Sequence, residues 1–450
     1  MHYYIYPAGK SGKTFGKMLD FIKANVGYSF IDDGKPGITL QEQAAEIKNR
    51  IANKEAEVVI VLTQGIRITE ERQKQLENNL MNVGIFTWLG SEFVEKIALQ
   101  VCIEAKKRIS ALTARGGGLI GVVLYGLAGE KHLGNVDYEL LRKGCKVIYL
   151  DSSGEDFTRV ERNDNVMVIP YLMDYFKYID FVKYFFSTAS TYTRNEKQIY
   201  FVQHHSYSSV LEAIMENKID YLREIYRNNI DYLFVACERI AKAAETLIKD
   251  LPQKNQPFLI KSGYAAFDNV KEIQEYSRDL VLFALHDEEE VLEIYEAIKM
   301  LLEKGYKVGL RYRYEWVGKS KDIIESLKSF PNFFVNYNNK DFETILAKTF
   351  VLITSASSVA YTFPIKHLCP AILYFKDKSL FEKTLGGVGF FDNRIHLMAN
   401  SSMEIFLKVQ EVQKINYKEK ILSYRDTEVI YFKEASRVIA DKILEIMQKG

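Results

Sequence analysis

The sequence predicts an α/β protein built from three successive α/β blocks. Short apolar runs that suit buried strands alternate with longer amphipathic segments that suit helices, and this alternation is typical of parallel sheets. A glycine-rich break at Arg115–Gly118 separates the first block from the second, where the strand–helix pattern starts again. The third block opens with the apolar run Leu280–Leu285. A chain of 450 residues, 47% of them hydrophobic, has room for about three cores.

The first block, residues 1–110, begins with a predicted strand at Tyr3–Tyr6. A helix should follow the turn Pro7–Gly12, because apolar residues then recur at helical spacing (Phe15, Met18, Leu19 and Ile22). The other elements expected in this block are a helix around Glu42–Ala52 and strands at Tyr28–Ile31 and Val58–Leu62.

The second and third blocks, residues 117–270 and 271–450, are similar in size and follow the same alternation. Strands are expected in the second block at Leu119–Tyr125, Lys146–Leu150, Val166–Ile169, Ile199–Val202, Tyr232–Ala236 and Phe258–Ile260. In the third block they are expected at Leu280–Leu285, Lys307–Tyr312, Phe333–Val335, Phe350–Ile353 and Ala371–Tyr374. One helix is predicted over Glu288–Glu303, with Val291, Leu292, Tyr295, Ile298, Leu301 and Leu302 on its apolar side. A long amphipathic helix over about Glu428–Gln448 closes the block.

The composition excludes several classes of protein. The 60 basic and 59 acidic side chains nearly cancel, so no basic field indicates a nucleic-acid partner. The four cysteines form no CxxC pair, which argues against a zinc or redox site, and each is expected to be a buried thiol. We expect no metal and no cofactor. No apolar run reaches the roughly 20 residues that a membrane span needs, and no signal peptide is visible, so a cytoplasmic location is expected.

The clearest functional signal lies at residues 350–359. The apolar run Phe350–Ile353 ends in the small hydroxyl-rich loop Thr354-Ser355-Ala356-Ser357-Ser358, before a helical segment. Free backbone amides and the positive end of the helix dipole attract phosphate at such a helix start. The loop could therefore hold the diphosphate of a nucleotide-activated donor. The alternative is a helix N-cap with no ligand.

A second glycine-containing turn, Gly9-Lys10-Ser11-Gly12-Lys13-Thr14, is not a P-loop, because Pro7 stands where the first glycine is needed. It fits better a degenerate dinucleotide turn with Gly9 and Gly12, and Asp32 lies where a ribose-binding acid would be expected. The alternative is an accessory domain of Rossmann type without a ligand.

Histidine and arginine side chains follow several predicted strands, at the strand ends where open parallel sheets bind ligands. His204 and His205 follow Ile199–Val202, and His286 follows Leu280–Leu285. A histidine placed there can take a proton from an attacking hydroxyl. Arg311 and Arg313 end another strand and could pair with phosphate oxygens. The alternatives are loop histidines with local hydrogen bonds and a solvated arginine pair.

Together these motifs resemble the CDP-glycerol glycerophosphotransferase family of teichoic-acid and capsule synthesis, which has a two-domain GT-B glycosyltransferase fold. The matching segments are Thr354–Val359 with Pro370–Tyr374, Gln203-His204, Phe283–His286, Arg311–Tyr314 and Gly263–Asp268. The chain departs from the family pattern at Ser355, where the family has an acid, and at Ala356, Ala265, His205 and Arg313. Residues 1–109 look like the small Rossmann-type domain seen beside sugar-modifying enzymes.

The resemblance implies a GT-B-like pair of Rossmann-type domains, with residues 1–110 as an additional Rossmann-like α/β domain. It implies a metal-independent transferase that moves glycerophosphate from a CDP-activated donor to an acceptor hydroxyl. His204 would be the base and His286 would contact the donor phosphate or the leaving group. Arg311, Arg313, Thr354, Ser355, Ser357 and Ser358 would bind the donor. His132, in the loop Gly126–Gly134, and His205 would lie near the acceptor.

Two other functions stay open, a nucleotide-sugar glycosyltransferase and a non-catalytic GT-B-like binding protein. The acceptor would be a polyol-phosphate, a glycan or a lipid-linked polymer, and the oligomeric state is not indicated. The aromatic run Tyr171–Phe186 could rest on a membrane surface or hold a lipid-linked acceptor. Its two aspartates and the lack of a wholly basic face argue against this, and a buried helix is the preferred interpretation.

Overall fold

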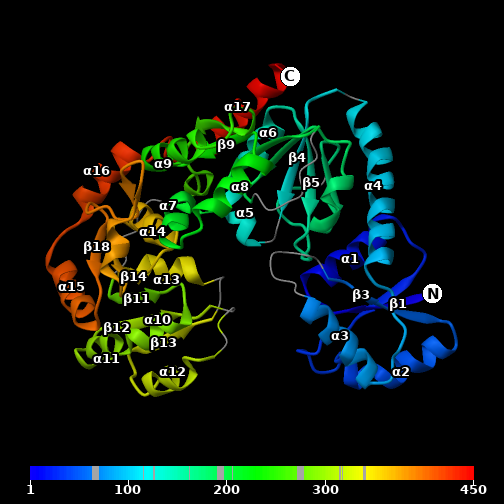
Figure 1. Ribbon diagram of the computed structural model, residues 1–450, viewed down its shortest axis with the longest axis horizontal. Helices are drawn as coiled ribbons and strands as arrows, with labels where there is room; N and C mark the ends of the chain where they lie inside the picture. Colours follow the sequence, from blue (N-terminus) through cyan, green and yellow to red (C-terminus); the bar gives the residue numbers. More distant parts are fainter. Residues whose placement is uncertain are drawn as a thin grey trace. The chain divides into compact units, whose positions relative to one another are not determined.

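The computed structural model describes residues 1–62, 70–114, 116–124, 127–161, 163–189, 197–204, 206–270, 278–313, 316, 318–337 and 341–449. The chain forms two compact units (Figure 1). Unit 1 contains Met1–Gln203, Asn228–Leu233 and Ser436–Gly450, and unit 2 contains His204–Arg227 and Phe234–Ala435.

The first sheet of unit 1 has three parallel strands in the order β2-β1-β3. These are β1 (His2–Tyr6), β2 (Gly27–Phe30) and β3 (Ala56–Ile60), and they alternate with α1 (Lys10–Phe21), α2 (Leu40–Ala52), α3 (Glu70–Asn82) and α4 (Ser91–Thr113). Helix α2 begins where Thr39 and Glu42 form a reciprocal capping box, which satisfies two free amides at its start.

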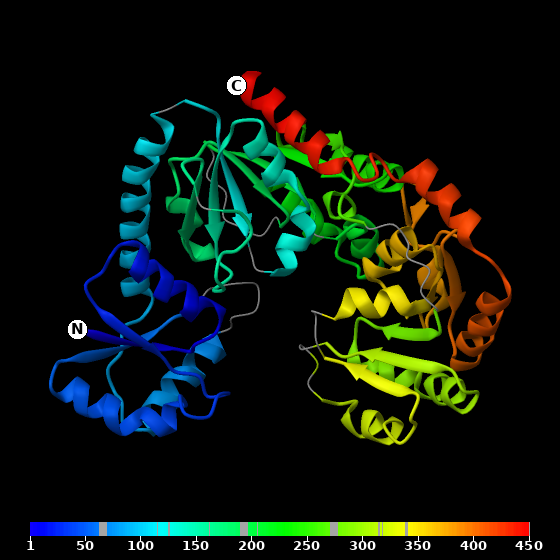
Figure 2. The ribbon, with the colours of Figure 1, turned by 180° about the vertical axis from the view of Figure 1, so that it is seen from behind.

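A second sheet has the strand order β10-β9-β8-β7-β4-β5-β6 within the described residues. Its strands are β4 (Leu119–Leu124), β5 (Lys146–Asp151), β6 (Val166–Pro170), β7 (Tyr184–Ser187), β8 (Ile199–Gln203), β9 (Tyr232–Val235) and β10 (Phe258–Lys261). The boundary between the two units falls inside β9. Helices α5 (Leu127–Leu133) and α6 (Val136–Arg142) lie between β4 and β5 in sequence. The C-terminal helix α17 (Ala435–Lys449, red in Figure 2) comes from the far end of the chain, and its residues from Ser436 onward belong to unit 1.

One apolar core runs through unit 1. It contains Phe15 and Met18 of α1 and Ile97 of α4, together with Ile148 of β5 and Ile169 of β6. All of these side chains are buried. Helices α1 and α4 therefore bury apolar surface against the second sheet as well as against their own, which contributes about 25 cal/mol for each Å² removed from water.

Unit 2 contains a six-stranded parallel sheet in the order β13-β12-β11-β14-β15-β18. Its strands are β11 (Leu280–Ala284), β12 (Lys307–Arg311), β13 (Phe333–Asn336), β14 (Thr349–Thr354), β15 (Ala371–Tyr374) and β18 (His396–Ala399). The strand order reverses between β11 and β14, as in Rossmann-type sheets, and ligands bind at such a switch point beyond the carboxyl ends of the strands.

In the described part of the chain, ten further helices lie wholly or mainly in unit 2; the first three precede β11 in sequence and the other seven follow it. They are α7 (Ser209–Met215), α8 (Ile219–Asn229), α9 (Glu238–Lys249), α10 (Glu288–Glu293), α11 (Tyr295–Glu303), α12 (Lys321–Leu327), α13 (Phe342–Lys348), α14 (Val359–His367), α15 (Ser402–Lys414) and α16 (Lys418–Glu428). A two-stranded antiparallel hairpin, β16 (Thr384–Leu385) with β17 (Val388–Gly389), lies between β15 and β18 in sequence.

The predicted α/β fold class is confirmed, and the strands lie within about two residues of their predicted bounds. The sequence did not predict strands β7 and β18 or the short hairpin of β16 and β17. The single helix expected over Glu288–Glu303 is wrong, because Ile294 leaves the helical conformation (φ −103°, ψ 9°) and separates α10 from α11. Leu292, expected on the apolar side, is exposed.

Two further helix predictions are wrong. The C-terminal helix begins at Ala435 instead of near Glu428, because Tyr431 and Lys433 have positive φ angles that interrupt it. The aromatic run Tyr171–Phe186 is not a helix. It contains a 3₁₀ turn (Met173–Tyr178) and the start of β7, and most of its apolar side chains lie in the core of unit 1.

All four cysteines carry free thiols, and Cys145 and Cys237 are buried as expected, while Cys102 and Cys369 are only partly buried. In the part of the chain that the structure describes, no helix combines the length and the apolar character needed to cross a membrane.

Candidate functional site

The carboxyl ends of β11 and β14 meet at the switch point of the unit 2 sheet. Thr354 closes β14, and its Oγ1 atom donates a 2.6 Å hydrogen bond to the carbonyl oxygen of Ala284, the last residue of β11. The backbone N–H of His286 donates to Oγ of Ser355 at 3.1 Å. The structure thus brings together three of the predicted site residues, His286, Thr354 and Ser355.

A fourth residue at this point, Glu290, was missed by the sequence reasoning. Its Oε2 atom accepts hydrogen bonds from Ser355 Oγ (2.8 Å) and from the backbone N–H groups of His286 (3.0 Å) and Asp287 (3.3 Å). Burial raises the pKa of Glu290 to about 7, and these hydrogen bonds oppose the rise. The Asp287-x-x-Glu290 spacing of a capping box was the one signal in the sequence that could have found it.

Cationic and aromatic side chains follow β11 and β12. Nη1 of Arg313 lies 3.5 Å from Nδ1 of His286, and the Trp316 indole N–H donates to the His286 carbonyl at 3.4 Å. Arg311 donates to the Asn336 side chain and lies over the Phe342 ring, 4.9 Å from its centroid. Arg313 is therefore next to His286, whereas Arg311 is held between the ends of β12 and β13.

Helix α14 begins directly after the hydroxyl-rich loop, with Ser358 as its N-cap. Oγ of Ser358 accepts a 3.0 Å hydrogen bond from the backbone N–H of Tyr207. The first turn of α14 contains no acidic residue, whereas the first turn of α10 contains Glu288, Glu289 and Glu290. The positive end of the α14 dipole is therefore not offset by its own side chains, and it suits an anion better than the start of α10 does.

His204 also belongs to unit 2. Its Nε2 atom lies 3.2 Å from the hydroxyl of Tyr226, and the two rings are stacked with centroids 5.6 Å apart. The partly buried Glu212 accepts hydrogen bonds from Ser206 (2.6 Å) and Ser208 (2.5 Å), and desolvation raises its pKa. These contacts hold the segment that follows His204 in one conformation.

A second contact, besides the Tyr207–Ser358 bond, joins this segment to the switch point. Oε1 of Glu216, just after α7, lies 4.0 Å from Nε2 of His286. The pair attracts whenever the imidazole is protonated. His286 thus lies between a carboxylate, Glu216, and a guanidinium, Arg313.

The predicted residues of unit 1 lie outside this network. Asp32 is used locally, because it accepts a 3.0 Å hydrogen bond from the Gly34 N–H and lies 3.8 Å from the Lys35 ammonium. A Cβ atom at Gly12 would lie 2.2 Å from the Pro7 carbonyl oxygen, so this glycine is required for packing. At Gly9 a Cβ would meet no atom of the described residues within 4 Å.

His132 lies on α5 and is half-buried. His205 lies outside the described residues. Ligand binding by Gly9, Gly12 and Asp32, and acceptor contact by His132 and His205, therefore stay predictions. No group of three or more potential metal ligands occurs within the described ranges.

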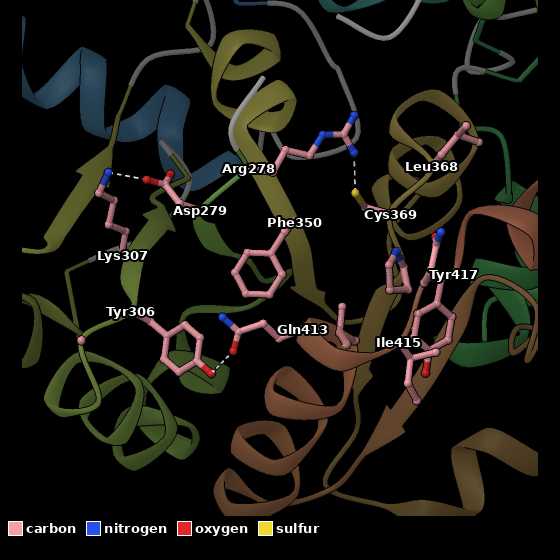
Figure 3. A pocket seen from close by; sticks show the side chains of 14 residues that line it. Arg278, Asp279, Tyr306, Lys307, Phe350, Leu368, Cys369, Gln413, Ile415 and Tyr417 are labelled. Atoms are coloured by element: carbon pink, nitrogen blue, oxygen red, sulfur yellow. Dashed lines mark hydrogen bonds and ion pairs between the residues drawn. The ribbon is translucent and has the colours of Figure 1, made fainter. Parts of the chain in front are cut away.

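A cavity of about 510 Å³ lies at the opposite, amino-terminal end of the same sheet (Figure 3). It is lined by the starts of β12 and β14, including Lys307 and Phe350. Its polar groups pair with one another, since Lys307 bonds to Asp279 and the Tyr306 hydroxyl donates to Gln413 at 2.8 Å. Parallel sheets bind ligands at their carboxyl ends, so this cavity is not the candidate site.

No family model and no curated protein matches the chain. Its fold is that of the GT-B glycosyltransferases, with a further α/β part at the N-terminus. Solved structures show this likeness.

The H548A variant of the wall teichoic acid polymerase TagF matches with a TM-score of 0.54 and 14% identity over 85% of this chain and 99% of that chain. TagF itself matches with a TM-score of 0.51 at the same identity and coverage. Sucrose-phosphate synthase from Thermosynechococcus elongatus has a TM-score of 0.47 and 11% identity over 74% of this chain and 98% of that chain. The resemblance to proteins of teichoic-acid synthesis, predicted from the motifs, is confirmed at the level of the fold.

Proposed function

We propose that this chain is a GT-B transferase that moves glycerophosphate from CDP-glycerol to an acceptor hydroxyl of a teichoic-acid-like or capsular polymer. The observation that carries the proposal is the network of His286, Ser355 and Glu290 at the switch point of the unit 2 sheet. The fold of TagF supports it, and one TagF variant of the same fold was studied with CDPG (TM-score 0.51, 13% identity).

The donor diphosphate would bind at the start of α14. The backbone N–H groups of Ala360 and Tyr361 already donate to the carbonyls of Ser357 and Ser358. The N–H groups that precede them, with the hydroxyls of Ser357 and Ser358, would donate hydrogen bonds to phosphate oxygens. Thr354 already donates to Ala284, so its role would be to hold the strand ends together. Arg313 and His286 would offset the charge that builds up on the leaving group, and Arg311 would add to the positive potential.

The acceptor hydroxyl would lose its proton to His204. The acceptor oxygen would form a bond to the phosphorus that bears the glycerol, the bond from that phosphorus to the oxygen bridging to CMP would break, and CMP would leave with the electron pair. Before the proton transfer, the contact between the Tyr226 hydroxyl and Nε2 of His204 would hold the imidazole in place. Removal of such a base typically lowers the rate by about 10²–10⁴-fold.

The test is direct assay of the purified chain with radiolabelled CDP-glycerol and with a panel of nucleotide sugars. Release of CMP, reduced by His204→Ala and by Arg311→Ala, would support the proposal. His2→Ala is the matched control, because His2 bonds to Ser29 in the first sheet of unit 1.

Three outcomes would overturn it in different ways. Turnover of a nucleotide sugar but not of CDP-glycerol would make the chain a glycosyltransferase. Turnover that neither substitution affects would remove the assigned site. Failure to turn over or bind any donor would favour a non-catalytic binding protein.

A further inference from the structure

The first turn of α10 carries three consecutive glutamates with different environments. Glu288 is buried and accepts hydrogen bonds from the Gly318 N–H (3.1 Å) and from the N–H and hydroxyl of Ser320 (both 2.8 Å). Glu289 is exposed and pairs with Lys319. Glu290 bonds to Ser355 and to the backbone of His286. One helical turn therefore ties the loop after β12 and the loop after β14 to the end of β11.

Within this turn, Glu290 is the residue that spans the switch point. The Ser355 hydroxyl accepts from the His286 N–H and donates to Glu290, so its proton has a fixed direction. The same Glu290 oxygen also accepts from that His286 N–H. Without the carboxyl group, the Ser355 hydroxyl would be free to rotate, and the loop that leads into α14 would lose its side-chain anchor to α10.

We propose that Glu290 is a positioning residue that fixes His286 and the loop of residues 355–358 relative to each other, and so sets the affinity of the site for a nucleoside diphosphate. The inference rests on the proposed function. Glu290 need not touch the ligand, because it acts through Ser355 and the His286 backbone.

The charge of Glu290 gives this role a pH dependence. With a pKa near 7 the carboxyl group is neutral in mild acid and becomes an anion in mild base, where it would repel a diphosphate. The other charged or titratable groups around it are Asp287, which raises its pKa further, the His286 ring with Arg313, and Tyr374 on β15, whose hydroxyl donates to Glu293. A Glu290→Gln variant leaves these neighbouring groups unchanged, so it isolates the contribution of the Glu290 charge to the pH dependence of binding.

The experiment is calorimetric titration of the full chain with CDP at pH 6, 7 and 8. At pH 6, where the Glu290 carboxyl group is neutral, Glu290→Ala should weaken binding of CDP by about tenfold or more, because the Ser355 hydroxyl and the His286 N–H lose their shared acceptor. Glu290→Gln keeps an acceptor oxygen, so it should bind close to wild type at pH 6 and more tightly than wild type at pH 8. Glu289→Gln, the matched control one position away, should bind as wild type does at each pH.

The outcomes separate the inference from the function on which it rests. If the wild type binds CDP and Glu290→Ala binds it equally well, the inference is overturned. If the wild type binds none of CDP, UDP and GDP, the proposed function fails, and hydrogen exchange then decides the positioning role. Faster exchange in residues 280–290 and 352–362 of Glu290→Ala, but not of Glu289→Gln, would support it, and unchanged exchange would overturn it.

Discussion

The backbone N–H of Tyr207 donates a hydrogen bond of 3.0 Å to the side chain of Ser358, which lies 151 positions further along the chain. The Tyr207 ring is buried against Tyr264, Phe267 and Tyr361, with centroids 5.5–5.6 Å away. The segment after His204 and the start of α14 are thus packed together in unit 2. The proposed acceptor base and the proposed diphosphate loop are therefore connected by a short path of packed residues.

Ser358→Ala should lower the free energy of unfolding by about 1 kcal/mol, because the Tyr207 N–H would lose its partner in a buried place. Ser357→Ala, the matched change one residue earlier, should leave stability within about 0.5 kcal/mol of wild type. Denaturant titration measures both values. An equal loss of stability in the two variants would contradict the structural role given to Ser358.

The stability of the chain should depend on the ionisation of Glu290. Its folded-state pKa of about 7 lies above the usual 4.5, so the folded state binds this proton more tightly than the unfolded state does. The unfolding free energy of wild type minus that of Glu290→Gln should therefore fall by up to about 3 kcal/mol as the pH rises from about 4.5 to 7. Above pH 7 this difference should stay low. Denaturation of the two proteins at pH 5 and at pH 8 checks the sign. If wild type instead became more stable relative to Glu290→Gln as the pH rises, this result would contradict the burial of the Glu290 carboxyl group.

Gly12→Ala should destabilise the chain by about 2 kcal/mol or more, because the new methyl group would lie 2.2 Å from the Pro7 carbonyl oxygen. The collision opposes the gain in helix propensity that alanine otherwise brings, which is below about 1 kcal/mol. Gly9→Ala is the matched control, and the loss there should stay below about 1 kcal/mol, as for an N-cap glycine. Thermal and denaturant unfolding distinguish the two. Similar losses at both positions would show that the turn is constrained for another reason.

Arg311→Lys should raise the donor KM more than it lowers kcat. Lysine keeps the charge but cannot lie flat over Phe342 while donating to Asn336, so the cation would no longer be held in place. Arg142→Lys, an exposed arginine paired with Glu139, should change neither constant. The assay is steady-state turnover of the donor identified by the CMP-release experiment. A lysine variant with wild-type constants would mean that Arg311 only supports the end of β12.

Most strands of the fold could be predicted, since each is a short apolar run followed by a helix-like segment. The ends of β11 and β14 could be predicted in the same way, and with them the placement of His286 and Thr354. The capping-box spacing indicates only that Glu290 lies at a helix start. Its role at the site could not be assigned, because its bond to Ser355 depends on a residue 65 positions away. The helix break at Ile294 and the positive φ angles at Tyr431 and Lys433 interrupt regular apolar patterns, so periodicity alone gave helices that were too long.

The aromatic run Tyr171–Phe186 is a second place where the local sequence did not determine the secondary structure. Its many apolar residues correctly indicated that the segment is buried. Over so short a length, however, a buried strand and a buried helix have similar patterns of apolar residues. Pairing of β7 with both β4 and β8 decides the outcome, and neither contact is visible in the local sequence.

The apolar core shared by α1, α4 and the second sheet has a consequence for how the chain can be shortened. A fragment that starts at residue 116 would leave Ile148 and Ile169 without the side chains of Phe15, Met18 and Ile97 against which they pack. Newly exposed apolar surface of this kind promotes self-association. We expect such a fragment to be recovered mainly in inclusion bodies, and co-expression with residues 1–113 as a separate polypeptide to restore it to the supernatant.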